Sequence, residues 1–460
     1  MKKKRIEFDS LGSKKIEVKK FWGIQTQRSL ENFKIGNEIM PMEMIVALGY
    51  QKKAAAMTNT ELGILEKKIG LTIIKSCEQI INCNLINEFP LLVWQTGSGT
   101  QTNMNINEVI SNYSIKLLKG KIGSKNPIHP NDHVNLSQSS NDVFPTAMHL
   151  ACLKTIDTKL INSLDYLIKE LKIKVNKFNK IIKIGRTHTQ DATPITLGQE
   201  FSGYLQQLIN NKTRILLSRK ELFNIPQGGT AVGTGINAPK NFDKVFCKNL
   251  KKITKYNFSP SSNKFESIAS HDSLVNLSSS LNTLAVSLLK ISNDIRFLAS
   301  GPRAGLGELY LPENESGSSI MPGKVNPTQI EALTMVCVQV IGNNTTVSLA
   351  GSQGNFELNA YKPVIIYNIL QSINLLSDSI NSFVRKCLKG IKPNKDQIKK
   401  NLNNSLMLVT ALNPVIGYDN SAKIAKKAFQ EKITLKEAAL KLKLISEKDF
   451  NKIVQPKKMV

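Results

Sequence analysis

The feature that most constrains the fold is a long heptad pattern of aliphatic residues near the middle of the chain. Spacings of three and four alternate without a break through Leu274, Leu277, Leu281, Leu284, Leu288, Ile291, Ile295 and Leu298. Such a pattern places one apolar stripe along a helix of roughly thirty residues, about 45 Å long at about 1.5 Å per residue. One compact neighbour cannot cover a stripe of that length, so other long helices must lie beside it.

Four further segments have the length and periodicity of such partners. They are residues 147–178, 196–222, 329–349 and 363–388. Together with the heptad segment at about 269–299, they predict a five-helix bundle. Strand-like alternation is scarce, so the predicted fold class is mainly α.

The bundle divides the chain into three predicted domains. Residues 1–138, with shorter helical patterns at 41–62, 64–81 and 105–118 among Gly, Pro and Asn, predict a mixed, mostly helical N-terminal domain. Residues 139–392 form the predicted central bundle domain. Residues 393–460 carry amphipathic segments at 421–430 and 435–442, the second with Thr434 as N-cap, and predict a small helical C-terminal domain.

Composition argues against a nucleic-acid partner despite a formal net charge of +27. Only eight of the 62 basic residues are Arg, Lys is scattered along the chain, and aromatic residues make up 6%. Proteins that bind nucleic-acid phosphates and bases favour clusters of Arg together with aromatic residues. The six cysteines form no C-x-x-C pair, which argues against a zinc ribbon or a disulfide framework. The first residues lack a signal-peptide pattern and no long apolar run is evident, so a cytoplasmic location without membrane contact is expected.

Residues able to carry chemistry concentrate in four Gly-, Ser- and Asn-rich segments near the ends of the long helices. Segment 317–327 reads Gly-Ser-Ser-Ile-Met-Pro-Gly-Lys-Val-Asn-Pro and places hydroxyl, ammonium and amide groups in a loop that Gly and Pro keep from being helical. Such groups can neutralise developing negative charge. On composition alone, a solvated linker is the alternative.

Of two other segments, one contains a histidine and the other is rich in glycine. Segment 185–191 is expected as a loop before a helix, with Thr193-Pro194 as the helix start signal, and His188 within it is either structural or catalytic. Segment 95–105 superficially resembles a phosphate loop but lacks the Gly-Lys-Ser/Thr ending. A hydroxyl-lined carboxylate cradle is therefore favoured there over a nucleotide site.

The fourth segment, 129–142, begins with a possible metal-ligand group. His129, Asp132 and His133 could bind a metal, but Pro130 interrupts a regular histidine pair and no H-E-x-x-H follows, so a metal site is not favoured. The end of the segment, residues 139–141, is more typical of a helix N-terminus that offers hydroxyl, amide and backbone N–H donors to an anion.

In this order and across essentially the whole chain, the four segments resemble the fumarase/aspartase superfamily and, within it, the iron-independent class II fumarases. The string Gly-Ser-Ser-x-Met-Pro-x-Lys-x-Asn-Pro at 317–327 is very specific for the superfamily, and the resemblance continues through 22–29, 228–235 and 354–359. The choice of fumarase rests on His188, Gly323, His129 and the Gly-Ser-Gly-Thr at 97–100, where aspartases usually carry other residues.

The resemblance implies a fumarate hydratase, a carbon–oxygen lyase of the tricarboxylic acid cycle that adds water reversibly and anti to fumarate to give (S)-malate, without a cofactor or metal. Ser318 would be the base for the carbon-bound proton, its alkoxide stabilised by the N–H groups of Gly317 and Ser319 and by Lys324. His188, oriented by Glu331, would act on the water. Which of Ser318 and His188 takes the carbon-bound proton stays open in the sequence.

The remaining implied residues stabilise charge or bind carboxylates. Lys324 and Asn326 would stabilise the aci-carboxylate that forms when the proton leaves. The substrate carboxylates would be held by Ser98, Thr100, Ser139, Ser140, Asn141, Thr187 and Ser319. An accessory anion site would consist of His129, Asn131 and Asp132, although Asn126, His133 and Leu136 depart from the common pattern around it.

The resemblance also implies a small dicarboxylate substrate and a homotetramer whose active sites are shared between subunits, with no nucleic-acid or membrane partner. Three alternatives are weaker. Aspartate ammonia-lyase, from the same superfamily, is the runner-up, and a catalytically silent scaffold is argued against by the intact site residues. A serine hydrolase is disfavoured because Ser318 lies in no Gly-x-Ser-x-Gly motif.

Overall fold

The computed structural model describes residues 3–460, so Met1 and Lys2 of the predicted N-terminal domain lie outside the described residues. The contacts within the chain divide it into two compact units. Unit 1 comprises the chain up to Asn162, Thr213–Ala285 and Val338–Leu376, and unit 2 comprises Ser163–Lys212, Val286–Cys337 and Ser377–Val460. The domain borders at 138 and 392 stay predictions.

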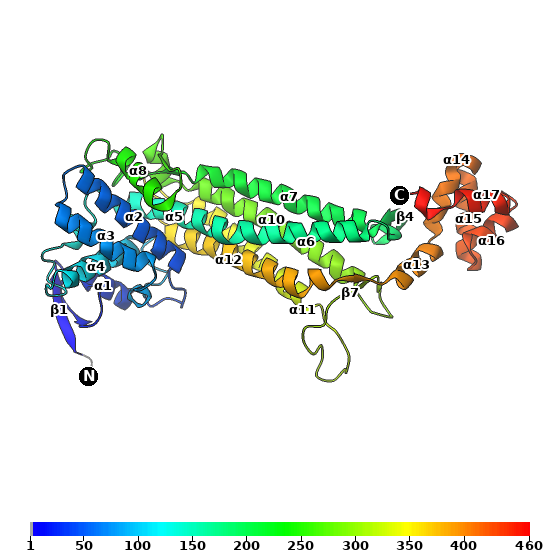
Figure 1. Cartoon of the computed structure of the whole chain (residues 1–460), viewed down its shortest axis with the longest axis horizontal. Helices are drawn as coiled ribbons and strands as arrows, with labels where there is room; N and C mark the ends of the chain where they lie inside the picture. The colour runs from blue at the N-terminus through cyan, green and yellow to red at the C-terminus, as the bar shows by residue number, and fades with distance from the viewer. Residues whose placement is uncertain (1–2) are drawn as a thin grey trace. The chain divides into compact units, whose positions relative to one another are not determined.

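The prediction of a mainly α fold with long helices is confirmed (Figure 1). The long helical stretches are α5 (Ser140–Thr155), continued through a π turn (Ile156–Leu160) into α6 (Ile161–Phe178), then α7 (Leu197–Glu221), α10 (Asp272–Leu298), α11 (Thr328–Gly351) and α12 (Lys362–Lys386). The first stretch begins seven residues before the expected position because Ser139 and Asp142 form a capping box ahead of it.

Helix α10 is the heptad helix, and its apolar stripe is the core of the bundle. The eight heptad side chains are between 0% and 6% exposed. Within residues 3–460, α10 is the one helix long and apolar enough to cross a membrane, judged by length and composition alone. Its most apolar window is 56% buried inside the protein. That burial is what the core helix of a folded domain requires.

Polar side chains connect the long helices inside each unit. In unit 1, the Ser278 hydroxyl of α10 donates a hydrogen bond to Asn344 Oδ1 of α11 at 2.9 Å. In unit 2, Asn381 Nδ2 of α12 donates to Ser163 Oγ of α6 at 2.9 Å. Each such pair satisfies polar groups that an apolar interface would otherwise leave without partners.

The predicted shorter helical segments correspond to α2, α3, α4, α15 and α16, and the structure adds further short helices that the sequence did not predict. Unit 1 begins with α1 (Ile24–Asn32), α2 (Met42–Glu61), α3 (Lys67–Ile81) and α4 (Thr100–Leu117), and also holds α8 (Phe242–Thr254) and α9 (Lys264–Ala269). The chain ends with α13 (Lys395–Asn404), α14 (Asn413–Ile416), α15 (Tyr418–Glu431), α16 (Leu435–Lys441) and α17 (Glu447–Ile453). Thr434 caps α16 in a capping box, as predicted.

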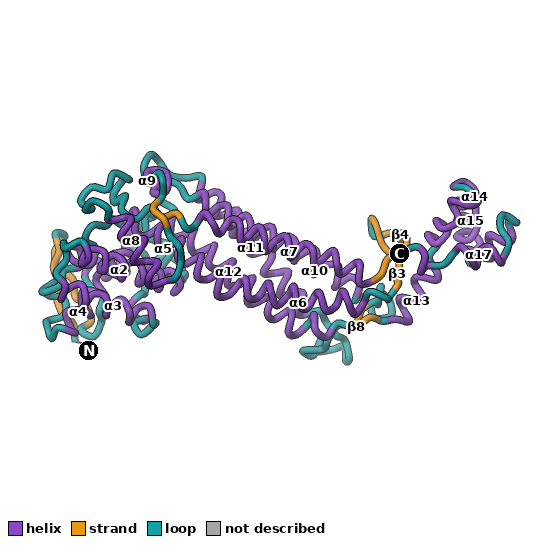
Figure 2. Tube along the Cα trace, turned by 45° about the horizontal axis from the view of Figure 1, so that its top comes forward, coloured by secondary structure: helices purple, strands orange, loops and turns teal. Residues whose placement is uncertain are grey.

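Strands occur only as four two-stranded sheets in the described part of the chain, small beside the helices in Figure 2. The pairs are β1 (Lys4–Asp9) with β2 (Gly12–Glu17), β3 (Ile182–Thr187) with β4 (Gln190–Thr196), β5 (Asn224–Ile225) with β6 (Ser259–Pro260), and β7 (Leu309–Tyr310) with β8 (Lys392–Pro393). The β5–β6 pair is parallel and the others are antiparallel.

The β3–β4 hairpin corrects one prediction. Residues 185–191 were expected to be a loop before a helix that starts at Thr193-Pro194, but both lie in the hairpin and α7 begins at Leu197. His188 and Thr189 have φ angles of 54° and 60°, and Thr187 pairs with Gln190. Positive φ at both central residues is what a two-residue turn needs to match the twist of its strands.

Candidate active-site residues

The loop between β7 and α11 contains the segment 317–327 and is closed on itself at its base. Gly317 permits the closure, since a Cβ there would lie 1.7 Å from the carbonyl oxygen of Lys324. Asn326 Nδ2 donates a hydrogen bond to the carbonyl oxygen of Gly317, and Lys324 Nζ donates to Asn326 Oδ1 at 2.8 Å. One loop therefore brings the predicted ammonium and amide together with Ser318.

The Ser318 hydroxyl oxygen accepts two backbone hydrogen bonds. The donors are the N–H groups of Ile320, at 3.3 Å, and of Met321, at 3.1 Å, rather than those of Gly317 and Ser319. A serine oxygen reaches backbone N–H groups two and three residues ahead more readily than those of its immediate neighbours. Ser318 is half-buried and lines a hollow of about 450 Å³ together with Lys324. Two N–H donors at one oxygen stabilise negative charge on it.

Thr187 and His188 lie at the exposed tip of the β3–β4 hairpin, and Glu331 is exposed in the first turn of α11. Within residues 3–460, neither a hydrogen bond nor an ion pair joins His188 to Glu331. Ser319 is also exposed, at the outside of its loop. The single chain thus presents these four side chains outward, and their predicted roles stay predictions.

Buried charges hold the base of the hairpin. Arg186 Nη2 donates to Glu308 Oε1 at 2.6 Å, and Lys183 Nζ lies 3.3 Å from Glu308 Oε2 and 3.0 Å from Glu200 Oε1. Burial opposes ionisation of Glu308, but the hydrogen bond from Arg186 and the charge of Lys183 outweigh it and lower the pKa of this carboxyl. The hairpin tip that bears His188 is therefore attached to a rigid base.

The N-terminus of α5 is built as the sequence predicts. Ser139 is the N-cap and its hydroxyl accepts from the Asn141 N–H at 3.2 Å. The buried Asp142 carboxylate accepts from the N–H groups of Ser139, at 2.9 Å, Gly228, at 2.9 Å, and Thr230, at 3.0 Å. Burial raises the pKa of Asp142 to about 6 in spite of these donors. The glycine-rich turn at 228–235 is thereby fastened to the helix end.

The N-terminus of α4 presents the hydroxyl groups of the segment 95–105. Ser98 Oγ and Thr100 Oγ1 are 2.8 Å apart and share a hydrogen bond. Gly97 has no room for a side chain, because a Cβ would lie 1.4 Å from the carbonyl oxygen of Ala360. Gly99 turns the chain into the helix at φ +78°. Half-buried hydroxyls next to free helix N–H groups are a suitable environment for a carboxylate.

Sequence reasoning missed a buried lysine behind these two helix ends. Lys52 of α2 is fully buried, and its Nζ donates to Asn135 Oδ1 at 2.9 Å and to Gln138 Oε1 at 3.1 Å. Burial lowers the pKa of Lys52 to about 7, although the charge of Asp142 opposes this. Asn103 Nδ2 of α4 donates both to Asn135 Oδ1, at 3.3 Å, and to Ser140 Oγ, at 3.0 Å. This network connects the two helix ends and orients Ser140.

The only sequence signal for that network was a Lys-Lys pair inside the alanine-rich helix at 51–56. Lys52 points inward, whereas its neighbour Lys53 pairs with Glu78 at 2.6 Å. Composition does not distinguish the two lysines, because only the packing of α2 decides which of them is buried.

The predicted accessory anion site lies in a short π turn, Pro130–Val134. His129 Nδ1 accepts from the N–H groups of Asn131 and Asp132, each at 3.2 Å, and burial lowers the pKa of His129 despite the nearby Asp132 carboxylate. An accepting Nδ1 places the proton of a neutral ring on Nε2. Asn131 and Asp132 are exposed. No group of three His, Cys, Asp or Glu side chains within residues 3–460 is placed to hold a metal.

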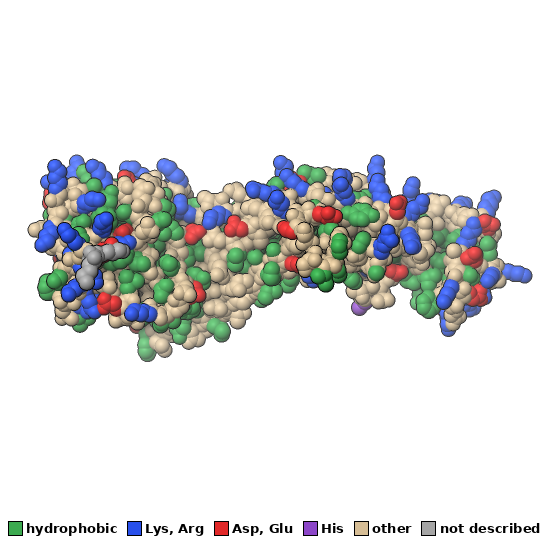
Figure 3. Space-filling view, turned by 90° about the horizontal axis from the view of Figure 1, so that it is seen from below, with side chains coloured by type: hydrophobic (Ala, Val, Ile, Leu, Met, Phe, Trp, Pro, Cys, Tyr) green, Lys and Arg blue, Asp and Glu red, His purple; other side chains and the backbone are tan. Residues whose placement is uncertain are grey.

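The structure therefore brings the predicted residues together in two sets. Unit 1 contains the hydroxyl and amide groups at 98–100 and 139–141, connected through Asn103, and the accessory site at 129–132. Unit 2 contains the loop at 317–326, the hairpin tip at 187–188 and Glu331. Basic side chains spread over the face shown in Figure 3 with acidic ones among them, so this face carries no single cationic patch.

Comparisons with known proteins cover the whole chain. A family model described as lyase matches residues 12–342, and one described as fumarase C C-terminus matches residues 408–460. The chain is 60% identical to "Fumarate hydratase class II" of Rickettsia conorii over 100% of this chain and 99% of that protein. It is 56% identical to "Fumarate hydratase, mitochondrial" of Rhizopus oryzae, over 100% and 93%. The crystal structure of class II fumarase from Schistosoma mansoni superposes with a TM-score of 0.98 at 46% identity, covering 99% of each chain.

Proposed function

The chain belongs to the class II fumarate hydratases of the fumarase/aspartase superfamily, and from that premise we propose which of its residues carry the reaction. The protein is a hydro-lyase that interconverts fumarate and (S)-malate. One observation carries the assignment of residues. The Ser318 oxygen accepts hydrogen bonds from two backbone N–H groups, in a loop that also holds Lys324 and Asn326.

In the direction of dehydration, Ser318 takes the proton from the carbon next to a carboxylate. The electron pair left behind makes an aci-carboxylate dianion, which is too unstable in water without preorganised positive charge. Lys324 and Asn326 supply that charge and a hydrogen-bond donor. The N–H groups of Ile320 and Met321 stabilise the Ser318 alkoxide before the proton arrives, which supports its use as a base.

His188 completes the reaction at the other carbon. It gives a proton to the departing hydroxyl, so the carbon–oxygen bond breaks and water leaves; in hydration it removes a proton from the attacking water. Glu331 orients the imidazole and raises its basicity. Because both side chains are exposed and unpaired with each other in the single chain, we propose that they meet their partners across subunits of a homotetramer.

The helix ends of unit 1 bind the substrate carboxylates in this proposal. Ser98, Thr100, Ser139, Ser140 and Asn141 provide hydroxyl and amide donors, and Thr187 and Ser319 would be contributed by neighbouring subunits. The unit 1 donors are half-buried, and the hydrogen bond from Asn103 holds Ser140 in place. Both features support the assignment, because a preorganised donor loses little entropy on binding. His129, Asn131 and Asp132 form an accessory anion site beside them.

The direct test is an assay of purified, chelator-treated protein with (S)-malate and, separately, with L-aspartate, following the ultraviolet absorbance of fumarate. Fumarate formed from malate alone supports the proposal. Fumarate formed from aspartate would identify an ammonia-lyase, and no fumarate from either substrate would indicate a silent scaffold.

Assembly and location are tested separately. We expect light scattering to find four chains per particle and dilution to the monomer to abolish turnover, since the proposed site is incomplete in one chain. An active monomer would overturn the shared-site proposal. We also propose a cytoplasmic location, which fractionation of source cells would check: recovery with the membrane pellet after a salt wash would contradict it.

A further inference from the structure

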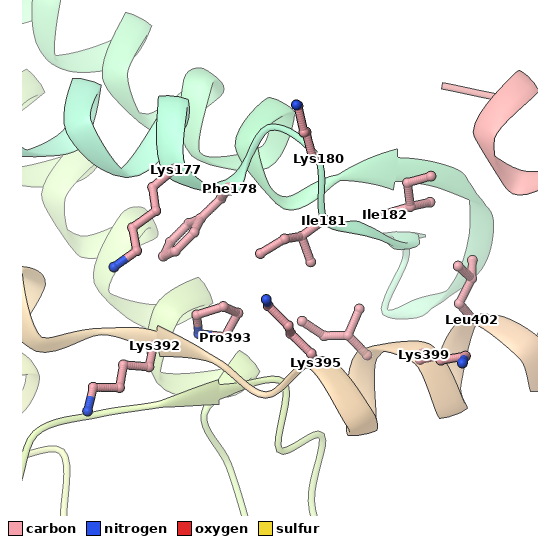
Figure 4. Close-up of a pocket in the computed structure, with 11 residues that line it drawn as sticks. Lys177, Phe178, Lys180, Ile181, Ile182, Lys392, Pro393, Lys395, Lys399 and Leu402 are labelled. Carbon is pink, nitrogen blue, oxygen red and sulfur yellow. The ribbon is translucent and has the colours of Figure 1, made fainter.

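A second hollow in unit 2 contains none of the residues assigned to the reaction. Its volume is about 610 Å³, within the range of pockets that take a small molecule. It lies where the end of α6 and the start of β3 face β8 and α13 (Figure 4). The side chains around it are of two kinds, apolar and lysine: Phe178, Ile181, Ile182, Pro393, Ile398 and Leu402, and Lys177, Lys180, Lys392, Lys395 and Lys399.

The two kinds of side chain are not mixed evenly. Figure 4 shows the ammonium of Lys395 among the apolar side chains, next to Ile181 and Pro393, with Lys177 and Lys392 on one side of it and Lys399 on the other, while Lys180 points away. Ile182 packs against the C-terminal apolar cluster to which Leu402 belongs. The hollow thus has an apolar wall and a cationic group that extends over it.

None of these five ammonium groups has an ion-pair partner among residues 3–460, and no carboxylate lines the hollow. Asp396, on the same helix, is exposed and not part of the lining. A second lysine-rich hollow of about 430 Å³ provides the comparison. It has no apolar side chain, and its Lys248 pairs with Glu61 at 2.9 Å. The general excess of lysine in this chain therefore does not by itself produce an unneutralised apolar hollow.

The physical chemistry of the hollow selects one class of ligand. Apolar side chains gain free energy when water is removed from them, at roughly 25 cal/mol for each Å² of apolar surface. An ammonium beside such a surface gains most from an anion that accepts its hydrogen bonds, because attraction between charges strengthens as the surroundings become less polar. A ligand that satisfies both has an anionic head and an aliphatic body.

We propose that this hollow binds a single-chain amphipathic anion, an aliphatic chain that ends in a carboxylate or a phosphate monoester. The head lies at Lys395, flanked by Lys177 and Lys392, and the chain lies on the half-buried Ile181, Ile182 and Pro393. The cationic groups surround a concavity instead of forming a flat face, which favours one free molecule over the surface of a lipid bilayer.

The test is calorimetric titration of the full-length protein with decyl phosphate below its micellar concentration. We expect saturable binding at one molecule per chain. Lys395→Gln should weaken it at least about tenfold, because a charge-assisted hydrogen bond is lost, and Ile181→Thr should weaken it by a smaller factor. Lys252→Gln, in the hollow beside Glu61, is the matched control and should bind as the wild type does. Turnover without the amphiphile should be the same in all four proteins.

Two further titrations distinguish the sources of binding. Decanol, which lacks the charge, and inorganic phosphate, which lacks the chain, should each bind at least about tenfold more weakly than decyl phosphate. Equal binding by wild type and Lys395→Gln, or binding that does not saturate, would overturn the proposal. So would binding to vesicles of anionic phospholipid without any binding of decyl phosphate, which would assign the hollow to a membrane surface instead.

Discussion

The two sets of proposed active-site residues are held in opposite ways. In unit 1 the donors at 98–100 and 139–141 are half-buried at helix ends, and buried groups such as Lys52 and Asp142 fix the backbone and side chains around them. In unit 2 His188 and Glu331 are exposed, and Ser318 is held only by hydrogen bonds within its own loop. In the proposed function, one chain preorganises the binding of a carboxylate, whereas the residues proposed to move protons would be enclosed by a neighbouring subunit.

The difference has a physical reason. A carboxylate is bound equally before and after the reaction, so its donors can be built permanently into the core. Charge that develops only in the transition state is stabilised best after water has been excluded. We therefore expect substitutions in the two sets to affect different kinetic constants.

The largest effect is expected for the exposed set. Ser318→Ala and His188→Asn should each lower turnover by about a thousandfold or more, because each removes a group that transfers a proton in the transition state. Malate dehydration, followed by the ultraviolet absorbance of fumarate, is the measurement. Circular dichroism and light scattering should match the wild type. Either variant with nearly normal turnover would remove that residue from the mechanism.

A second prediction concerns the buried lysine of the other set. Lys52 has a pKa of about 7 in the folded chain, lowered by burial, so above that pH the unfolded chain holds a proton that the folded chain does not. The contribution of Lys52 to stability then rises with pH between about 7 and 10, at up to about 1.4 kcal/mol per pH unit for one such group. Buried Lys362 and Lys174, whose pKa burial lowers to about 7 and about 8, contribute in the same direction.

Urea unfolding at pH 7 and pH 9 measures that slope. Lys52→Met should reduce it, and Lys53→Met, which removes an ion-paired neighbour on the same helix, should not. Of the titratable groups that face Lys52, burial raises the pKa of Asp142 to about 6, below the tested range. Burial raises the pKa of Cys77 to about 12, so the unfolded thiol, which ionises near about 8.5, opposes the Lys52 slope only at the upper end of the range. Cys77 is present in all three proteins, so the difference between their slopes isolates the lysine. An identical slope in wild type and Lys52→Met would show that Lys52 stays protonated when folded.

The Asn103→Ala substitution tests the hydrogen bond that connects α4 with the N-terminus of α5. It removes the donor to Ser140 Oγ and leaves every proton-transferring group in place. We expect KM for malate to rise about fivefold, the loss of roughly 1 kcal/mol from one hydrogen bond, with kcat nearly unchanged. Thr283→Ala, an exposed hydroxyl on α10, is a control that should change neither constant. A fall in kcat alone would place Asn103 with the exposed set.

The smallest expected effect is a displacement of the pH profile. Glu331→Gln should displace the pH profile of kcat/KM for malate dehydration, because the His188 imidazole would lose the carboxylate that the proposed assembly places beside it. Glu447→Gln, which changes an exposed carboxylate at the start of α17, is the control. An unchanged profile in Glu331→Gln would show that the two side chains do not meet in the assembled enzyme.

Much of the fold was predictable from the sequence because helix formation depends on local periodicity. The heptad helix was expected at about 269–299 and extends over Asp272–Leu298, and Thr434 was recognised as an N-cap from its position before an apolar run. The hairpin around His188 was missed, since Thr193-Pro194 is equally compatible with a helix start and with an edge strand. The turn conformation at residues 188–189 decides between them.

The sequence by itself determined the long helices, the mainly α class and the segments proposed to hold chemistry, because each depends on residues close together along the chain. Only the tertiary structure decided that Lys52 and not Lys53 is buried, and that one lysine-rich hollow lacks a carboxylate. These facts depend on which side of an element faces the core and on residues more than eighty positions apart, which no local pattern encodes.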